Sequence, residues 1–140
     1  MKKIVFVCLG NICRSPMAEF VMKSLTDQLK IESRATSSWE HGNPIHRGTQ
    51  AIFKKYAISY DRNKTSQQIS AADFADFDYV IGMDESNVRD LKRMASEDFQ
   101  HKIYQFEEES VPDPWYTGDF DQTYDLVLAG CKKWLERLDG

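Results

Sequence analysis

Two side chains near the start of the chain have the types and the spacing needed to attack a phosphate group. Cys8 and Arg14 are separated by five residues that include Gly10, and Ser15 follows directly. A thiolate can attack phosphorus, and a guanidinium can hold two phosphate oxygens at once. The pattern therefore predicts a phosphate loop, residues 8–15, in which a sulfur nucleophile faces a bound phosphorus atom.

The sequence on either side of the phosphate loop predicts a strand before it and a helix after it. An apolar run predicts a buried strand over residues 3–8, and Pro16 suits the first position of a helix with Ser15 as its N-cap. Backbone N–H groups and the dipole at a helix N-terminus favour a bound anion. In that field the thiol of Cys8 should ionise to the nucleophilic thiolate.

The remaining residues of the phosphate loop have supporting tasks in this hypothesis. Gly10 permits unusual backbone angles and the close approach of a ligand. The hydroxyl of Ser15 can hydrogen-bond the sulfur, and the side-chain amide of Asn11 can fix the shape of the loop. A simpler interpretation of Cys8 alone is a small buried hydrophobic residue at the end of a strand. The residues expected to surround the phosphate are Leu9, Gly10, Asn11, Ile12, Cys13, Arg14 and Ser15.

Cleavage of a phosphate ester also needs an acid that delivers a proton to the leaving oxygen. Asp113 is the candidate, because Pro112 and Pro114 stiffen the chain on both sides of it. Trp115 and Tyr116 follow directly and can line a pocket and exclude water. Asp-Pro is also a common turn sequence, so a solvated Asp113 in a surface turn is the alternative interpretation.

The order of apolar runs and helical patterns predicts an α/β fold. Strands alternating with helices form parallel sheets. We therefore expect a single domain over residues 1–140, a flavodoxin-like three-layer sandwich with a four-stranded parallel sheet and helices on both faces. Ligands bind at the carboxyl ends of the strands in such sheets, where the phosphate loop falls. The strands are expected over residues 3–8, 31–36, 78–83 and 102–106, and the helices over 16–29, 47–56, 70–75, 84–94 and 120–138.

Composition and charge argue against several other classes of protein. The 140 residues carry a net charge of −4, which argues against nucleic-acid binding, and no apolar run is long enough to cross a membrane. Three cysteines without metal-binding spacing argue against a disulfide framework and a zinc site. The first residues lack the features of a signal peptide. We expect a cytoplasmic protein, a monomer or weak dimer, that needs no metal or cofactor.

Taken together, the motifs resemble those of the low-molecular-weight protein tyrosine phosphatases. The similarity begins with Val7–Glu19 and ends with Asp113–Tyr116. It covers nearly the whole chain, and the two motifs are highly specific when they occur together. Further matching segments between them are Thr36–Glu40, Gly42–Pro44, Asp76–Tyr79 and Met83–Asn87.

This resemblance implies hydrolysis of phosphotyrosine and small aryl phosphates through a phosphocysteine intermediate. It implies that Cys8 is the nucleophile and that Arg14 binds the phosphoryl group and stabilises the transition state. Asp113 would protonate the tyrosine oxygen and then activate water. Tyrosine-phosphorylated proteins are the implied partners, and no cofactor is implied.

The resemblance also implies roles for residues around these three. Ser15 and Ser33 would support the loop and the thiolate, and Asp84 would hold the loop through Arg14. The walls that accept an aromatic ring would be Trp39, Trp115 and Tyr116.

The chain departs from the family pattern at three places. Many relatives carry His-x-Ala-Arg-Gln, whose His bonds the loop Asn, where this chain has Lys64–Gln68, which leaves more of the support of Asn11 to Ser33. Trp115 stands where Tyr or Phe is common. Relatives that act on phosphoarginine carry Thr at the position of Ile12, so Ile12 favours phosphotyrosine.

Three other functions fit parts of the pattern. A phosphoarginine phosphatase and a thioredoxin-coupled arsenate reductase share this loop and fold, but the reductase needs two further cysteines and only Cys131 lies outside the loop. A non-catalytic phosphotyrosine-binding module would lack the nucleophile or the acid, and both are present.

Cys13 has two interpretations that the sequence leaves open. It can pack beneath the loop as an inert buried thiol. Alternatively, it can trap oxidised Cys8 as a reversible disulfide, as relatives with this second Cys do. Cys131 falls on the apolar stripe of the last predicted helix and is expected in the core.

Overall fold

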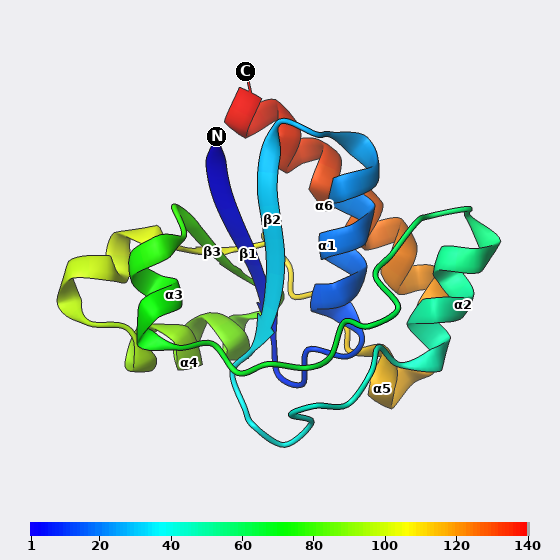
Figure 1. Ribbon diagram of the computed structural model, residues 1–140, viewed down its shortest axis with the longest axis horizontal. Coiled ribbons are helices and arrows are strands. Elements are labelled where there is room, and N and C mark those ends of the chain that lie inside the picture. Colours follow the sequence, from blue (N-terminus) through cyan, green and yellow to red (C-terminus); the bar gives the residue numbers. More distant parts are fainter. Residues whose placement is uncertain (140) are drawn as a thin grey trace.

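The computed structural model describes residues 1–139 and contains a sheet of four parallel strands in the order β2-β1-β3-β4 (Figure 1). β1 lies between two neighbours because Ile4–Val7 is apolar on both of its sides and is fully buried. The predicted four-stranded parallel sheet is confirmed. The strands are β1 (Lys2–Cys8), β2 (Leu29–Ala35), β3 (Tyr79–Gly82) and β4 (Ile103–Gln105).

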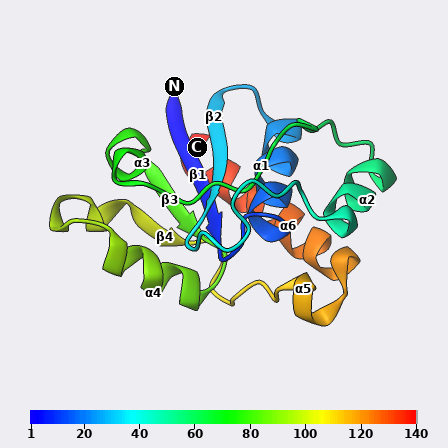
Figure 2. The same cartoon turned by 60° about the horizontal axis from the view of Figure 1, so that its bottom comes forward.

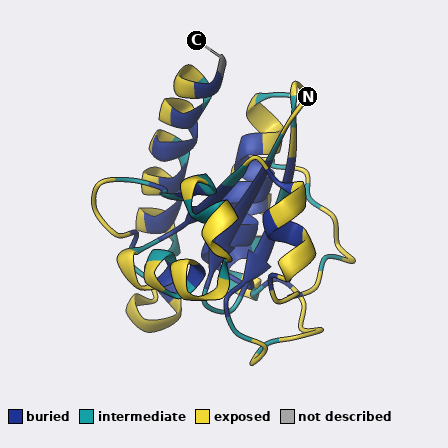
Figure 3. Ribbon diagram, turned by 90° about the vertical axis from the view of Figure 1, so that its left-hand side faces the viewer, coloured by how far each residue is buried: buried dark blue, intermediate teal, exposed yellow. Residues whose placement is uncertain are grey.

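Helices cover both faces of the sheet and complete the three layers. Ile4, Phe6 and Cys8 point toward one face, and Val5 and Val7 toward the other, as the alternation of a strand requires. The outer sides of the helices are exposed while the strands between them are buried (Figure 3). The first face carries α1 (Arg14–Leu25), α2 (Arg47–Lys55) and α6 (Phe120–Asp139), and the second carries α3 (Ala71–Asp76) and α4 (Glu85–Met94).

The start of α1 differs from its prediction. The helix begins at Arg14 with Cys13 as its N-cap, so the predictions of Ser15 as the cap and Pro16 as the first helical residue are wrong. Ser15 is drawn into the helix because its hydroxyl bonds groups of the phosphate loop. The helix also ends at Leu25, and not near residue 29, because Leu29 already pairs with β1.

Two short helices were not predicted. A 3-10 helix, η1 (Glu97–Lys102), precedes β4, and a single turn, α5 (Pro114–Thr117), follows Asp113. Elements of four to six residues leave little periodicity in a sequence.

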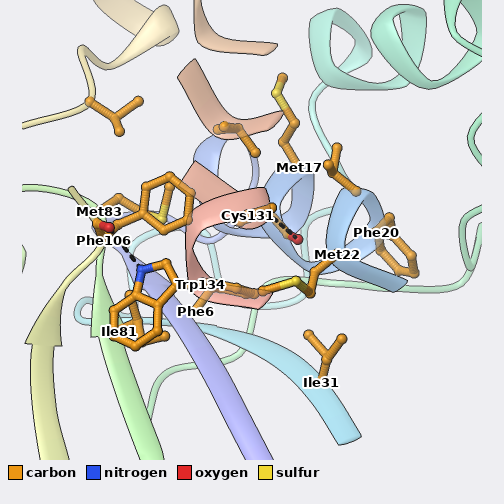
Figure 4. Close-up of a cluster of buried hydrophobic side chains, with 14 of the residues drawn as sticks. Phe6, Met17, Phe20, Met22, Ile31, Ile81, Met83, Phe106, Cys131 and Trp134 are labelled. Atoms are coloured by element: carbon orange, nitrogen blue, oxygen red, sulfur yellow. Dashed lines mark hydrogen bonds between the residues drawn. The ribbon is translucent and has the colours of Figure 1, made fainter. Parts of the chain in front are cut away.

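The C-terminal helix fixes the chain just beyond β4. Trp134 Nε1 donates a hydrogen bond to the carbonyl of Phe106 at 2.8 Å (Figure 4). The ring of Phe106 lies directly on α6 at Gly130, where any side chain would collide with it. α6 therefore anchors the start of the connection that leads to Asp113.

The first strand and the last helix meet at the opposite edge of the sheet from the phosphate loop. Lys2 Nζ donates to the carbonyl of Leu138 at 2.8 Å, so the beginning of β1 and the last turn of α6 are in contact. Among residues 1–139, no helix has the length and apolar content needed to span a membrane.

Candidate active site

Parallel strands point the same way, so their carboxyl ends meet at one edge of the sheet. The phosphate loop follows β1, Asp84 follows β3 and Asp113 lies beyond β4. These connections lie at the bottom of Figure 1 and come forward in Figure 2. The topology therefore brings together residues that are about a hundred positions apart in the sequence, such as Cys8 and Asp113.

The carbonyl groups of the phosphate loop are held by other parts of the chain. In a trans peptide the N–H of the next residue points opposite to the carbonyl, so holding the carbonyls outward turns the N–H groups inward. The loop thus directs a set of donors at one point, as an anion requires. The carbonyls of Cys8, Leu9, Gly10, Ile12 and Cys13 accept hydrogen bonds from Thr36 N, Ser37 Oγ, Ser66 Oγ, His46 N and Thr49 Oγ1, respectively.

The sulfur of Cys8 accepts hydrogen bonds from within the phosphate loop. The side chain is buried, and its Sγ accepts from the backbone N–H of Asn11 at 3.3 Å. Ser15 Oγ lies 3.1 Å from the sulfur and 3.3 Å from the carbonyl of Arg34. A thiolate at Cys8 can therefore receive hydrogen bonds from a backbone amide and a hydroxyl.

Asn11 holds the loop in an unusual shape. Its φ of 56° lies in the left-handed region, which Asn tolerates better than most residues, whereas Gly10 does not adopt it. Gly10 therefore does not use the unusual angles that its missing side chain permits, although it lines the pocket beside Cys8. Asn11 is fully buried, and its Nδ2 donates to Ser15 Oγ at 2.8 Å and to Ser33 Oγ at 3.0 Å. Its Oδ1 accepts from the N–H of Gln67 at 3.1 Å, which fixes the orientation of the amide.

Ser33 connects Asn11 to a buried ion pair. Ser33 Oγ donates to Glu19 Oε1 at 2.6 Å, and Lys64 Nζ lies 3.5 Å from the same oxygen. Lys64 also donates to the carbonyl of Ser33 at 2.8 Å. Burial lowers the pKa of Lys64, and the carboxylate of Glu19 opposes that shift.

The ion pair sets the direction of the hydrogen bonds that lead back to the sulfur. A carboxylate only accepts, so Ser33 must give its hydrogen to Glu19 and accept from Asn11. Asn11 gives its other amide hydrogen to Ser15 Oγ, so the hydroxyl hydrogen of Ser15 is left for the two acceptors near it, the sulfur of Cys8 and the carbonyl of Arg34. A directed series of hydrogen bonds therefore runs from the sulfur through Ser15, Asn11 and Ser33 to Glu19. Lys64 pairs with Glu19 at the far end of this series.

Arg14 is clamped between the phosphate loop and the groups beyond β3 and β4. Its Nη1 donates to Asp84 Oδ2 at 2.6 Å and to the carbonyl of Val111 at 2.9 Å, and its Nη2 lies 3.5 Å from Asp113 Oδ2. Burial alone would lower the pKa of Arg14, but the negative charges of Cys8, Asp84 and Asp113 outweigh it and raise the pKa. The guanidinium therefore stays charged although it is buried.

Asp113 lies on a second segment, the acid loop, residues 111–118. Its Oδ1 accepts from the N–H of Trp115 at 3.1 Å and so caps α5. Pro112 and Pro114 restrict the backbone on both sides of the carboxyl. Its side chain is about one-fifth exposed, so the carboxyl can reach both solvent and the pocket.

The two loops enclose a cavity of about 140 Å³. Arg14, Asn11, Ser15, Ser33 and Asp84 lie behind its wall. Trp39 and Tyr116 are both more than three-quarters exposed, so they form a rim that the protein itself does not cover. The lining residues are Cys8, Leu9, Gly10, Ile12, Cys13, Trp39, Glu40, Asp113, Trp115 and Tyr116.

The other two cysteines are buried free thiols. Burial raises the pKa of Cys13, and the nearby charges of Cys8 and Asp113 add to this, while burial alone raises the pKa of Cys131. Both are therefore protonated at neutral pH, although Cys13 also lines the pocket. Within residues 1–139, no three His, Cys, Asp or Glu side chains are grouped so that they could hold a metal ion.

Several residues of the site were not recognised from the sequence. Glu40 lines the pocket, and the ring of His46 packs edge-on against Trp115 with the ring centres 5.6 Å apart. The donors that hold the loop carbonyls, such as Ser66 and Thr49, lie in other segments of the chain. No spacing rule joins a Ser or Thr to a carbonyl that is tens of residues away.

Comparison with known proteins identifies the family. A family model described as low molecular weight phosphotyrosine protein phosphatase matches residues 3–140. The chain belongs to this family of cysteine-dependent protein tyrosine phosphatases.

Individual relatives agree with this assignment. The low molecular weight protein-tyrosine-phosphatase PtpA of Staphylococcus aureus is 45% identical over 141 residues, which cover 94% of this chain and 90% of that protein. The crystal structure of SP-PTP, a low molecular weight protein tyrosine phosphatase from Streptococcus pyogenes, is 63% identical with a TM-score of 0.97, over 99% of this chain and 93% of that one. A Drosophila arginine phosphatase, DARP, is 32% identical with a TM-score of 0.89, over 100% and 99% of the two chains.

Proposed function

We propose that Cys8, Arg14 and Asp113 hydrolyse phosphotyrosine through a phosphocysteine intermediate. The observation that carries this proposal is the position of Cys8, whose sulfur accepts from the backbone N–H of Asn11 and which lines the same cavity as Asp113. A nucleophile and an acid that line one small cavity are the two groups that displacement at phosphorus requires.

In the first step the thiolate of Cys8 attacks the phosphorus, and the bond between phosphorus and the tyrosine oxygen breaks. Arg14 and the N–H groups of the loop stabilise the negative charge on the three other oxygens. Asp113, protonated at this stage, gives its proton to the leaving phenolate oxygen. The products are free tyrosine and Cys8 with a covalently bound phosphoryl group.

In the second step water attacks the phosphorus of the phosphocysteine. Asp113, now a carboxylate, accepts a proton from that water. The bond between sulfur and phosphorus breaks, and the hydroxyl of Ser15, whose Oγ lies 3.1 Å from the sulfur, stabilises the departing thiolate with a hydrogen bond. Inorganic phosphate leaves, and Cys8 is restored.

The exposed aromatic side chains at the rim fit an aromatic substrate. Trp39, Trp115 and Tyr116 surround the entrance and can pack against the ring of a phosphotyrosine. We propose tyrosine-phosphorylated proteins as substrates. We also propose that the protein acts as a monomer or weak dimer. Three free thiols support a reducing compartment such as the cytoplasm.

Hydrolysis of p-nitrophenyl phosphate by the wild type and by Cys8→Ser tests the proposal. The wild type should release phosphate and give a protein-bound phosphoryl group on rapid acid quench, and Cys8→Ser should do neither. Equal activity of the two proteins would remove Cys8 from the mechanism. Phosphoarginine is the comparison substrate, and a higher kcat/KM for it than for phosphotyrosine would assign the site to arginine phosphate.

A further inference from the structure

A second cleft, with a volume of about 790 Å³, lies beside α2. One wall is a single face of the helix, because Arg47, Gln50, Ala51 and Lys54 follow one another at helical spacing. Ala57, with a φ of 55°, turns the chain back after the helix. The other wall is the returning segment, of which Ile58, Ser59, Tyr60 and Arg62 line the cleft.

The cleft has a positive charge with no negative charge to balance it. Its only charged lining residues are Arg47, Lys54 and Arg62. Among the side chains that the structure describes, none of the three has a carboxylate within ion-pairing distance. Lys55, which follows Lys54, instead pairs with Asp121 at 2.8 Å. Although the chain has a net charge of −4, three cationic side chains without an ion-pair partner among the described residues line this one cleft.

The base of the cleft suits a peptide better than a bare ion. Two apolar residues, the fully buried Phe53 and the partly buried Ile58, also line the cleft. Tyr60 donates its hydroxyl hydrogen to Gln50 Oε1 at 3.1 Å, and the guanidinium of Arg62 lies over the ring of Tyr60 at 6.0 Å. A ligand that carries both carboxylates and apolar side-chain carbon, as an acidic peptide does, matches this mixture of groups.

The cleft begins next to the active site. Arg47 follows His46 directly, and the ring of His46 packs against Trp115 of the pocket wall. α2 and α5 are neighbours in both Figure 1 and Figure 2. From Arg47 to Lys54 the helix rises about 10 Å, which three extended peptide residues span.

We propose that this cleft binds an acidic segment that flanks the phosphotyrosine of a protein substrate. The proposal rests on the proposed function, because it places the phosphotyrosine in the pocket of Cys8. Glu40 in that pocket repels acidic residues directly beside the phosphotyrosine, whereas the cations of α2 attract those a few residues farther along. The cleft therefore selects among phosphoproteins, and the pocket carries out the reaction.

The experiment uses two pairs of phosphotyrosine peptides, one pair for each side of the phosphotyrosine. The two members of a pair differ only in carrying Glu or Gln at the second to sixth positions from the phosphotyrosine. The wild type should show a kcat/KM about fivefold higher for one Glu peptide than for its Gln counterpart, since exposed ion pairs contribute modestly. Arg47→Gln combined with Lys54→Gln and Arg62→Gln should abolish this preference by raising KM. Lys55→Gln, on the same helix, is the matched control and should leave it unchanged.

Two further measurements separate the possible outcomes. Turnover of p-nitrophenyl phosphate, which has no flanking residues, should be the same in the wild type and in the triple variant. Raising the salt from about 0.1 M to about 1 M shortens the screening length from about 10 Å to about 3 Å and should remove the preference. A preference that survives in the triple variant, or is lost equally in Lys55→Gln, overturns the proposal.

Direct binding keeps this test independent of catalysis. Fluorescence anisotropy with the labelled non-phosphorylated Glu peptide should show weaker binding to the triple variant than to the wild type. If the wild type hydrolyses no aryl phosphate, the proposed function fails while this binding still decides the assignment of the cleft. Tighter binding of inorganic polyphosphate or single-stranded DNA than of the Glu peptide would assign the cleft to another polyanion and overturn the proposal.

Discussion

The phosphate loop and the acid loop face each other across one cavity. Most of the phosphate loop is buried, and other parts of the chain hold its carbonyls and the side chain of Asn11. In the acid loop, Trp115 to Gly118 are exposed, and α5 is a single turn capped by Asp113. The half of the site proposed to hold the phosphate is therefore built into the core, and the half proposed to move the proton lies on the surface.

This difference separates two requirements of catalysis. Donors that stabilise charge at phosphorus must be in place before the substrate arrives, because reorganising them during the reaction costs energy. The wall that meets the leaving group instead contacts the variable part of a substrate. Arg14 joins the two loops through Val111 and Asp113, so its guanidinium connects a rigid half with an exposed one.

The largest expected effect is on the acid loop, in Asp113→Asn. Asn retains the cap on α5 but cannot deliver a proton, so kcat should fall by about a hundredfold or more while the unfolding free energy stays nearly constant. Steady-state kinetics with aryl phosphates of different leaving-group pKa measures this effect. The loss should shrink as the leaving group becomes more acidic, and a loss independent of the leaving group would contradict the acid role.

On the phosphate loop, Asn11→Ala should reduce stability and activity together. The change removes three hydrogen bonds of a buried amide and leaves Ala at a left-handed φ, which should cost about 3 kcal/mol of unfolding free energy. Urea denaturation measures this cost. Asn11→Gly relieves the backbone strain alone and should recover part of it, and equal costs for the two variants would show that strain contributes little.

A smaller effect is expected where the directed series of hydrogen bonds ends, in Lys64→Met. In this variant the carbonyl of Ser33 loses a hydrogen-bond donor and Glu19 Oε1 loses its ion-pair partner. The expected loss of unfolding free energy is about 1–2 kcal/mol. Lys23→Met is the control, because Lys23 pairs with the other oxygen of Glu19 from an exposed position. If both variants lower kcat/KM and stability equally, the buried position of Lys64 has no special role.

The lowered pKa of Lys64 adds a pH dependence to this comparison. In the alkaline range between that pKa and the ordinary value near 10.5, the unfolded chain binds more protons at this residue than the folded protein does. Lys64 therefore makes the unfolding free energy rise with pH in that window. Denaturation at several pH values gives the unfolding free energy of the wild type and of Lys64→Met. The wild-type value minus that of the variant should increase with pH in this window, and a decrease would contradict the effect of burial on Lys64.

The smallest effect is expected at the rim, in Tyr116→Ala. Tyr116 is 77% exposed, so its loss should leave the unfolding free energy within about 0.5 kcal/mol of the wild type. It should raise KM for aryl phosphates by about threefold and leave kcat nearly unchanged, because it removes contact with the ring only. A large fall in kcat would show that the rim also positions Asp113.

The sequence was sufficient to place candidate groups whose positions depend on local structure alone. Cys8 and Arg14 could be recognised because a strand, a loop and a helix follow one another directly around them. The contact of Ser33 with Asn11 and that of Asp84 with Arg14 were expected only from resemblance to a family, because strand order decides which distant residues meet. The sheet was predictable from its apolar runs, which need no knowledge of their partners.

The errors of prediction share a physical cause. Ser15 has a strong intrinsic preference for a helix cap, but its hydroxyl hydrogen-bonds in the active site, so Cys13 becomes the cap instead. Gly10 permits a left-handed angle that is in fact adopted by Asn11, whose side chain is fixed by Ser33 and Gln67. In both cases tertiary hydrogen bonds outweigh a local preference.

The contact between Lys2 and Leu138 brings the first strand and the last helix together. A short linker could therefore join these two segments, and the chain could be reopened elsewhere as a circular permutant. A new opening in the exposed stretch Glu108–Ser110 would leave the phosphate loop continuous. It would also make the acid loop the beginning of the polypeptide. The acid loop would then be connected covalently only to α6, and the direct chain connection from β4 to the acid loop would be lost.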